Sequence, residues 1–244
     1  MRRERLKAAV HVHSDWSYDG KWPLKTLAVE FNRRGYRIIM TAEHDRGFTQ
    51  PRFERYREAC AQASTDRMLI IPGIEYSDAS NIVHILVWGS ARFLGERVPT
   101  GRLLETVTTE NGVAVLAHPS RLNAWNVFNP AWKTGLTGLE LWNRKSDGWA
   151  PSQTVFPLPK ELDLVAFAGI DFHDRRQFFP LSMTLNGKAT ITEESVLDSL
   201  RSRQWQACAF GVSLSGNMIL RALSALRAIE RKRRLLARIY RWYK

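Results

Sequence analysis

All six histidines of the 244-residue chain stand in short segments that contain acidic residues or lie close to them. His11 and His13 form a His-x-His pair, and His44 stands between Glu43 and Asp45. The other three are spread along the chain: His84, His118 and His173. Imidazole and carboxylate groups together suit zinc, manganese or iron(II). The pattern therefore predicts a multinuclear site for divalent metal ions.

Short apolar runs that alternate with amphipathic stretches must position these side chains, and this alternation is typical of βαβ units. Strands are expected at 6–13, 37–43, 68–75, 83–88, 113–117, 138–142, 164–170 and 207–211. Helices are expected at 23–34, 52–63, 101–111 and 193–203. Each acidic or histidine motif comes at the end of an expected strand, which is where α/β barrels gather catalytic residues. His11 and His13, two residues apart on a strand, would share one face and could chelate one ion.

The order of the motifs resembles that of the PHP (polymerase and histidinol phosphatase) family. Residues 11–20 read His-x-His-Ser-x-x-Ser-x-Asp-Gly, and the segments TAEHD, GIE, AHP and GIDFH follow in sequence. The resemblance covers residues 6–175 by motif and extends to about residue 212 as a domain. It implies an α/β fold, a distorted, TIM-barrel-like (β/α)7 barrel. It also implies two or three bound divalent metal ions and hydrolysis of phosphoester bonds.

The same resemblance implies which residues hold the metals. The first ion would take His11, His13, Glu75 and Asp171. The second would share Glu75 as a bridge and add His84 and His118. The third would take Asp19, His44 and His173. Two positions depart from the family pattern: Glu43 replaces an aspartate, and Phe172 replaces a smaller residue that would leave the pocket wider.

Closely spaced divalent ions activate water and clamp a phosphoryl group, so the expected attacking group is metal-activated hydroxide. Asp171 and His173 are the residues expected to assist proton transfer. A phosphate substrate also needs fixed positive charge. Arg121 and Arg175 are favoured for that role over the other cations near the motifs, Arg46, Arg144, Lys145 and Arg176. Ordinary solvated surface charge is the alternative for each of them.

The positive charge is concentrated at the C-terminal end. Residues 217–244 hold nine of the Lys and Arg residues and one Glu, and therefore +8 of the net charge of +12. We expect a barrel domain at 1–216 and a basic amphipathic helix at 217–244. Its arginines would form one side, and the other would be apolar: Ala222, Leu226, Ile229, Leu236, Ile239 and Tyr243. Three interpretations stay open for this tail: docking of its apolar side on the barrel, binding to an anionic membrane surface, or binding to nucleic acid.

The main functional hypothesis is a metal-dependent phosphoesterase that acts on a small phosphomonoester or a nucleotide-like phosphodiester. Alternatives are nuclease-like activity on oligonucleotide ends, and a non-catalytic, metal-stabilised module that recruits a membrane or partner through its tail; amide hydrolysis is a weaker option. The irregular, Trp-rich segment 122–159 is expected either to shape the substrate pocket or to form a loop that its own aromatic side chains pack against the barrel. With two cysteines, no signal peptide and no apolar run suited to a membrane span, we expect a cytoplasmic protein, with peripheral membrane attachment left open.

Overall fold

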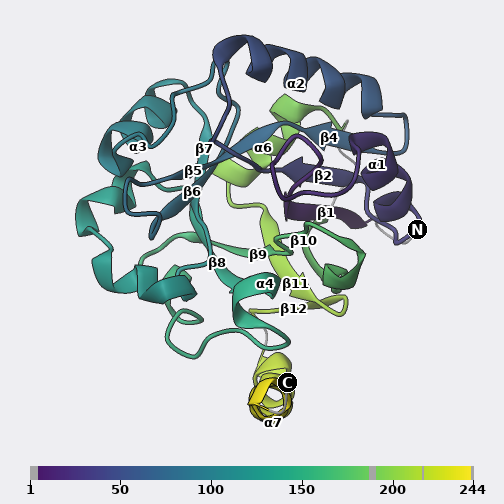
Figure 1. The fold of residues 1–244 in the computed structure, drawn as a ribbon, viewed down its shortest axis with the longest axis vertical. Coiled ribbons are helices and arrows are strands. Elements are labelled where there is room, and N and C mark those ends of the chain that lie inside the picture. The colour runs from purple at the N-terminus through teal and green to yellow at the C-terminus, as the bar shows by residue number, and fades with distance from the viewer. Residues whose placement is uncertain (1–4, 187–190, 216, 243–244) are drawn as a thin grey trace.

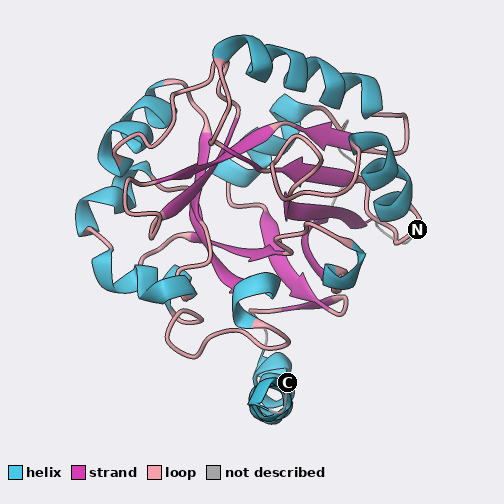
Figure 2. Ribbon diagram, viewed as in Figure 1, coloured by secondary structure: helices cyan, strands magenta, loops and turns pink. Residues whose placement is uncertain are grey.

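A computed structural model describes residues 5–186, 191–215 and 217–242. Its strands form two six-stranded sheets, which lie in the middle of the molecule with helices around them (Figure 2). The first sheet has the order β12 (Val212–Ser213), β11 (Trp205–Ala209), β10 (Leu181–Asn186), β1 (Arg5–Val12), β2 (Ile38–Thr41) and β4 (Leu69–Ile71). The second has the order β3 (Glu43–His44), β5 (Gly73–Ser77), β6 (His84–Trp88), β7 (Val113–Leu116), β8 (Gly138–Asn143) and β9 (Val165–Gly169).

The helices lie on the outside of the sheets (Figure 1). They are α1 (Leu24–Asn32), α2 (Gln50–Ala63), α3 (Thr100–Thr109), α4 (Arg144–Asp147), α5 (Leu158–Glu161), α6 (Glu193–Arg201) and α7 (Asn217–Trp242), with short 3-10 helices at Arg121–Val127, Pro130–Gly135 and Arg175–Gln177. Strands β2, β7 and β8 are buried at every residue. Burial on both faces is typical of sheets that are covered by helices, and it explains the near-continuous apolar runs in the sequence.

The two sheets approach each other at two places without forming a single continuous ladder. On one side, Ala42 separates β2 from β3, and its N–H donates to the carbonyl of Val12. On the other, the segment after β9 pairs with the end of β1, where Phe172 accepts from His13 and donates to His11. The mixed α/β architecture is therefore confirmed, but the described strands do not form the closed (β/α)7 barrel that was expected.

The sheets are mixed rather than wholly parallel. β6 runs antiparallel to both β5 and β7, and β10 runs antiparallel to β1 and β11. The hairpin between β5 and β6 turns through residues 78–83. Because β6 is reversed, its first residue, His84, lies at the same edge as the ends of the parallel strands. The histidine motifs therefore still converge, although one of them begins a strand instead of ending it.

The chain's final described element is α7, seen end-on at the lower edge of Figure 1. Its packing differs from the expected pattern: Leu223 is fully buried, whereas Ile229 and Leu236 are 48% and 65% exposed. The side expected to be apolar is thus largely in solvent where it is described, so its docking on the barrel, one of the three open interpretations, is not supported there. The basic amphipathic tail is not confirmed as such, and residues 243–244 lie outside the described residues. Within the described part of the chain, no helix combines the length and apolar character needed to cross a bilayer.

Candidate metal centre

The nine residues expected to bind metals lie together at one edge of the sheets. Eight of them fall into three groups in which potential ligand atoms lie within 4.8 Å of one another. The groups are His13, Asp19, His44 and His173; His11, Glu75 and His118; and His11, His13 and Asp171. The ninth, His84, contacts Glu75 through its Nδ1 at 2.7 Å. The grouping resembles the three expected ligand sets.

Glu75 lies at the centre of this cluster on β5, with only 1% of its surface exposed. Its Oε1 lies 2.7 Å from His84 Nδ1 and 2.8 Å from His118 Nε2. Its Oε2 lies 3.1 Å from His44 Nδ1 and 3.5 Å from His11 Nε2. One carboxylate therefore faces histidines of more than one group, as a bridging ligand must.

The remaining carboxylates face the other histidines. Asp19 Oδ1 lies 3.3 Å from His44 Nε2, and Asp19 Oδ2 lies 3.1 Å from His173 Nε2. Asp171 Oδ1 lies 3.7 Å from Nε2 of both His11 and His13. Asp19 is a third exposed, so this part of the cluster opens toward solvent.

Several buried polar atoms of the cluster have no hydrogen-bond partner within the described structure. They are Nε2 of His11, His13 and His44, Nδ1 of His118, and Oδ1 of Asp19. A buried polar atom without a partner costs about 1–3 kcal/mol. This cost is relieved at the ring nitrogens and the carboxylate oxygen that face a cation if cations bind within the cluster. The donor set of imidazoles and carboxylates fits zinc, manganese or iron.

The pKa values of two histidines indicate that the cluster favours positive charge. Burial lowers the pKa of His11, but the carboxylates of Glu140, Asp171 and Glu75 raise it well above the ordinary value. Burial also opposes protonation of His44, yet the nearby carboxylates of Asp19 and Glu75 raise its pKa to about 10. The carboxylates thus keep protons on His11 and His44, whereas burial and the neighbouring His44 and His173 lower the pKa of His13 well below its ordinary value. Divalent ions supply the same charge, so their binding is expected to release protons.

The backbone is unusual at three of these residues. His11, His118 and Asp171 have positive φ angles of 63°, 27° and 52°. Residues other than glycine rarely adopt this region, and such outliers gather at functional sites. At His11 the register of β1 against β2 also shifts between Val10 and Val12. The His-x-His pair therefore lies on a bulged strand, not on the regular strand that its spacing suggests, and its ring centroids are 5.1 Å apart.

Sequence reasoning missed Glu140, a fully buried residue of β8. Its Oε1 lies 2.9 Å from His11 Nδ1, and its Oε2 accepts from the backbone N–H of His118 at 2.8 Å. Asn143 Nδ2 also donates to that oxygen. Glu140 thus orients two ligand candidates. The signal was present in GLELWN, where a single acidic residue interrupts an otherwise apolar strand.

A cavity of about 370 Å³ opens onto the cluster. Four of the residues that line it are cationic: Arg46, Arg97, Arg121 and Lys145. Lys145 Nζ lies 3.0 Å from His173 Nε2 and 3.6 Å from Asp171 Oδ1.

Of the two arginines favoured for phosphate, Arg121 lines this cavity and Arg175 is not among the lining residues. The Trp-rich segment contributes Lys145 and Ser146 to the lining but none of its tryptophans.

Several solved structures have an architecture similar to that of this chain. A two-domain protein from Bacteroides vulgatus, containing a predicted PHP-like metal-dependent phosphoesterase, superposes with a TM-score of 0.65 at 17% identity, over 91% of this chain and 70% of that one. The chain has the PHP-like fold. PsfC from Pseudomonas syringae is similar, with a TM-score of 0.64 at 14% identity, over 93% of this chain and 99% of its own.

The lesion-specific endonuclease Q from Pyrococcus furiosus shares the PHP-like fold, with a TM-score of 0.57 at 12% identity. The match covers 82% of this chain and 56% of the endonuclease, which is therefore much longer than the shared part. No family model matches the sequence. No curated protein matches it either. The resemblance to the PHP family is thus confirmed at the level of the fold.

Proposed function

We propose that the protein is a metal-dependent phosphoesterase that hydrolyses a small phosphomonoester or a nucleotide-like phosphodiester. The observation that carries this proposal is the convergence of buried imidazole nitrogens without partners and of carboxylates beneath a cavity whose lining includes four cations as well as carboxylates. Metal-binding groups suit the activation of water, and the cations suit a phosphate. The PHP-like fold of the solved structures supports the same kind of reaction.

The expected division of labour follows from where each residue lies. Two or three ions would be held by the nine residues of the cluster: His11, His13, Asp19, His44, Glu75, His84, His118, Asp171 and His173. Bound divalent ions supply Lewis-acid charge and lower the pKa of water. Lys145 and Arg121 would bind the phosphate oxygens from the side of the cavity. Asp171 and His173 would accept or return a proton, with Lys145 Nζ within 3.0 Å of His173 Nε2 to restrain its position.

Nuclease-like activity on oligonucleotide ends is the second candidate. The observation that favours it is the number of cations in the cavity lining, where Arg46 and Arg97 add to Arg121 and Lys145, although carboxylates line the cavity as well. An endonuclease with a lesion-containing duplex at its active site also shares the fold, at 12% identity. If the substrate is a polyanion, kcat/KM should fall steeply as the salt concentration rises, because salt weakens binding of the phosphates.

The test combines elemental analysis of the purified protein with a screen of phosphomonoesters, phosphodiesters and oligonucleotides after adding manganese, zinc or iron. The expected result is bound metal and phosphate release that Asp171→Asn abolishes. Asp163→Asn is the matched control, because Asp163 is an exposed aspartate outside the cluster. Bound metal without turnover on any phosphoester would overturn the proposal and favour amide hydrolysis or a non-catalytic module.

A further inference from the structure

The outward side of α7 carries a continuous apolar surface, which we call the outer stripe. Three of its residues are large and exposed: Ile229 at 48%, Leu235 at 59% and Leu236 at 65%. Helical periodicity places Ala225, Ala228 and Lys232 on the same side. These three residues are also exposed. No other helix of the described structure leaves several large apolar side chains in solvent along one side.

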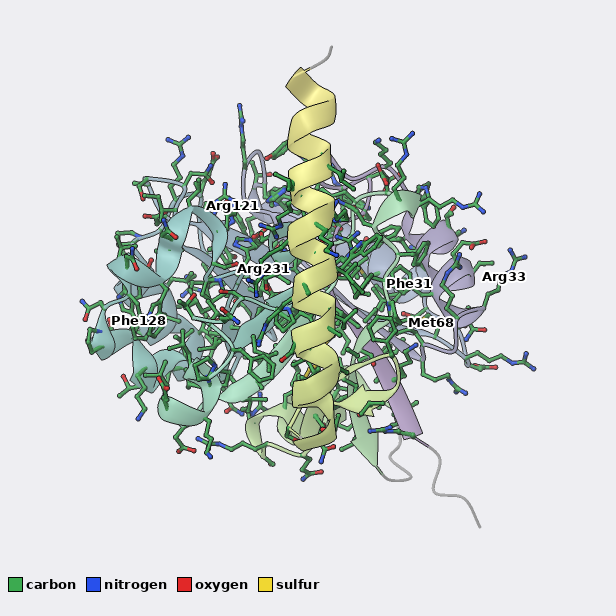
Figure 3. The ribbon with its side chains drawn as sticks, turned by 90° about the horizontal axis from the view of Figure 1, so that it is seen from below. Phe31, Arg33, Met68, Arg121, Phe128 and Arg231 are labelled. Carbon is green, nitrogen blue, oxygen red and sulfur yellow. The ribbon has the colours of Figure 1, made fainter. Side chains whose placement is uncertain are left out.

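The contacts of the inner side fix which way α7 faces. Leu223 is fully buried, and Glu230 is 5% exposed where it accepts from Arg233 and Arg234. Arg234 also donates to the carbonyl of Asp147 at the end of α4, and Arg227 donates to the carbonyl of Pro151. Figure 3 shows α7 lying lengthwise across one face of the domain. Turning the helix to bury the outer stripe would break all of these contacts.

Positive charge borders the outer stripe. Helical periodicity places Arg231 on one border and Arg233 on the other, with Lys232 between them. Among the described residues, the side chains of Arg231 and Lys232 have no hydrogen bond or ion pair, unlike those of Arg233 and Arg234. Over its whole length α7 has eight basic residues and one acidic residue, Glu230. A ligand that covers this side must therefore accept apolar side chains and anionic contacts at once.

We propose that the outer stripe binds an anionic lipid bilayer, with α7 lying in the plane of the interface. Ile229, Leu235 and Leu236 would enter the boundary between headgroups and acyl chains, and the bordering cations would contact lipid phosphates. The aliphatic part of Lys232 can lie along the apolar surface while its ammonium group reaches the phosphates. The role is distinct from hydrolysis, since none of these residues lines the cavity over the metal cluster.

Other partners fit this surface less well. Nucleic acid would satisfy the cations through its phosphates but would leave Ile229, Leu235 and Leu236 without apolar contact. A second copy of the chain would cover the apolar residues, yet a two-fold interface would place Lys232 and its bordering arginines against the same cations of the partner. An anionic bilayer surface offers both an apolar interior for the leucines and isoleucine and phosphates for the bordering cations.

The test is co-sedimentation of the full chain with vesicles of phosphatidylcholine alone or of equal parts of phosphatidylcholine and phosphatidylglycerol. Binding is expected only to the anionic vesicles. The double variant Leu235→Gln/Leu236→Gln should weaken it on the order of tenfold or more, because two large apolar side chains would no longer leave water on binding. Arg231→Gln/Lys232→Gln should weaken it as well and reduce its dependence on salt.

The matched control is Val29→Gln, which changes a 51% exposed apolar residue of α1. Circular dichroism should show that every variant is folded, and hydrolysis of a soluble substrate should be unchanged in the leucine variant. Equal binding of the wild type and the leucine variant to anionic vesicles would overturn the proposal. So would binding to a single-stranded oligonucleotide without binding to vesicles, or a dimer in sedimentation velocity that the leucine variant dissociates.

Discussion

At the scale of single residues, the centre depends on groups that orient the ligands as well as on the ligands themselves. The histidines and carboxylates were recognisable in the sequence because their types and order carry the signal. Glu140 was not, because nothing local marks a buried acid on β8 as the partner of His11 on β1, 129 residues away. Such pairing becomes visible only when the sheets bring the strands together.

Glu140→Gln should weaken metal binding by roughly 10- to 100-fold, the usual effect of removing a group that orients metal ligands. The amide retains one acceptor oxygen, so it cannot accept from both His11 Nδ1 and the His118 N–H, as Glu140 does. Metal affinity measured by competition with a chromophoric chelator checks this prediction. Glu161→Gln, on the short helix α5, is the control; equal affinity in both variants would contradict the role of Glu140.

Lys145→Met should reduce kcat/KM for a phosphoester by at least about tenfold, since a hydrogen bond to a charged group contributes about 1.5–3 kcal/mol. The substitution keeps an unbranched side chain, one heavy atom shorter, and removes the ammonium that lies 3.6 Å from Asp171 Oδ1. Steady-state kinetics at constant metal occupancy measures the effect. Lys160→Met, on α5 and outside the cavity lining, is the matched control. Unchanged kinetics in Lys145→Met would remove this residue from the substrate site.

At the scale of elements, the sequence predicted where many strands lie better than how they pair. The expected strands 37–43 and 68–75 are each divided, at Ala42 and at Pro72, between the two sheets. β10 was missed although Leu181–Asn186 alternates apolar and polar residues, and its polar Ser182 and Thr184 are nevertheless buried. Pairing and direction depend on contacts far apart in the chain, which local periodicity does not encode.

The end of α4 provides a prediction about pH. Burial raises the pKa of Asp147 to about 6, although the Ser120 hydroxyl and the Asn143 N–H donate to its carboxylate. A raised pKa means that the folded state binds more protons than the unfolded state, so this contribution to stability is present at low pH and is lost as pH rises through about 6.

Lowering the pH from neutral to about 5 should therefore stabilise the wild type relative to Asp147→Asn by about 1–2 kcal/mol. Comparing the two proteins cancels the titration of all other groups that they share. Urea unfolding of both proteins across this pH range measures the difference. Parallel stability profiles would show that the Asp147 carboxyl titrates near its ordinary pKa in the fold.

At the scale of the whole molecule, the metal cluster draws its residues from both sheets. His11 and His13 come from β1 and the segment after it, and Glu75 and His84 come from the second sheet. Asp171 and His173 come from the segment after β9, which pairs with the end of β1. Ions held by these residues would cross-link segments that lie far apart in the sequence. The cluster should therefore contribute to the stability of the entire domain as well as to its chemistry.

Removing metal with a chelator should lower the melting temperature, and restoring manganese or zinc should raise it again. An ion that binds only the folded state stabilises it, and the effect grows with the ratio of free ion concentration to Kd. It reaches about 2.7 kcal/mol when the ion concentration is about a hundred times Kd. Differential scanning calorimetry with stepwise metal addition measures this shift. His118→Ala should show a smaller metal-dependent shift than the wild type, because it removes a ring that lies 2.8 Å from Glu75. A melting temperature that does not respond to metal in either protein would show that the cluster binds no stabilising ion.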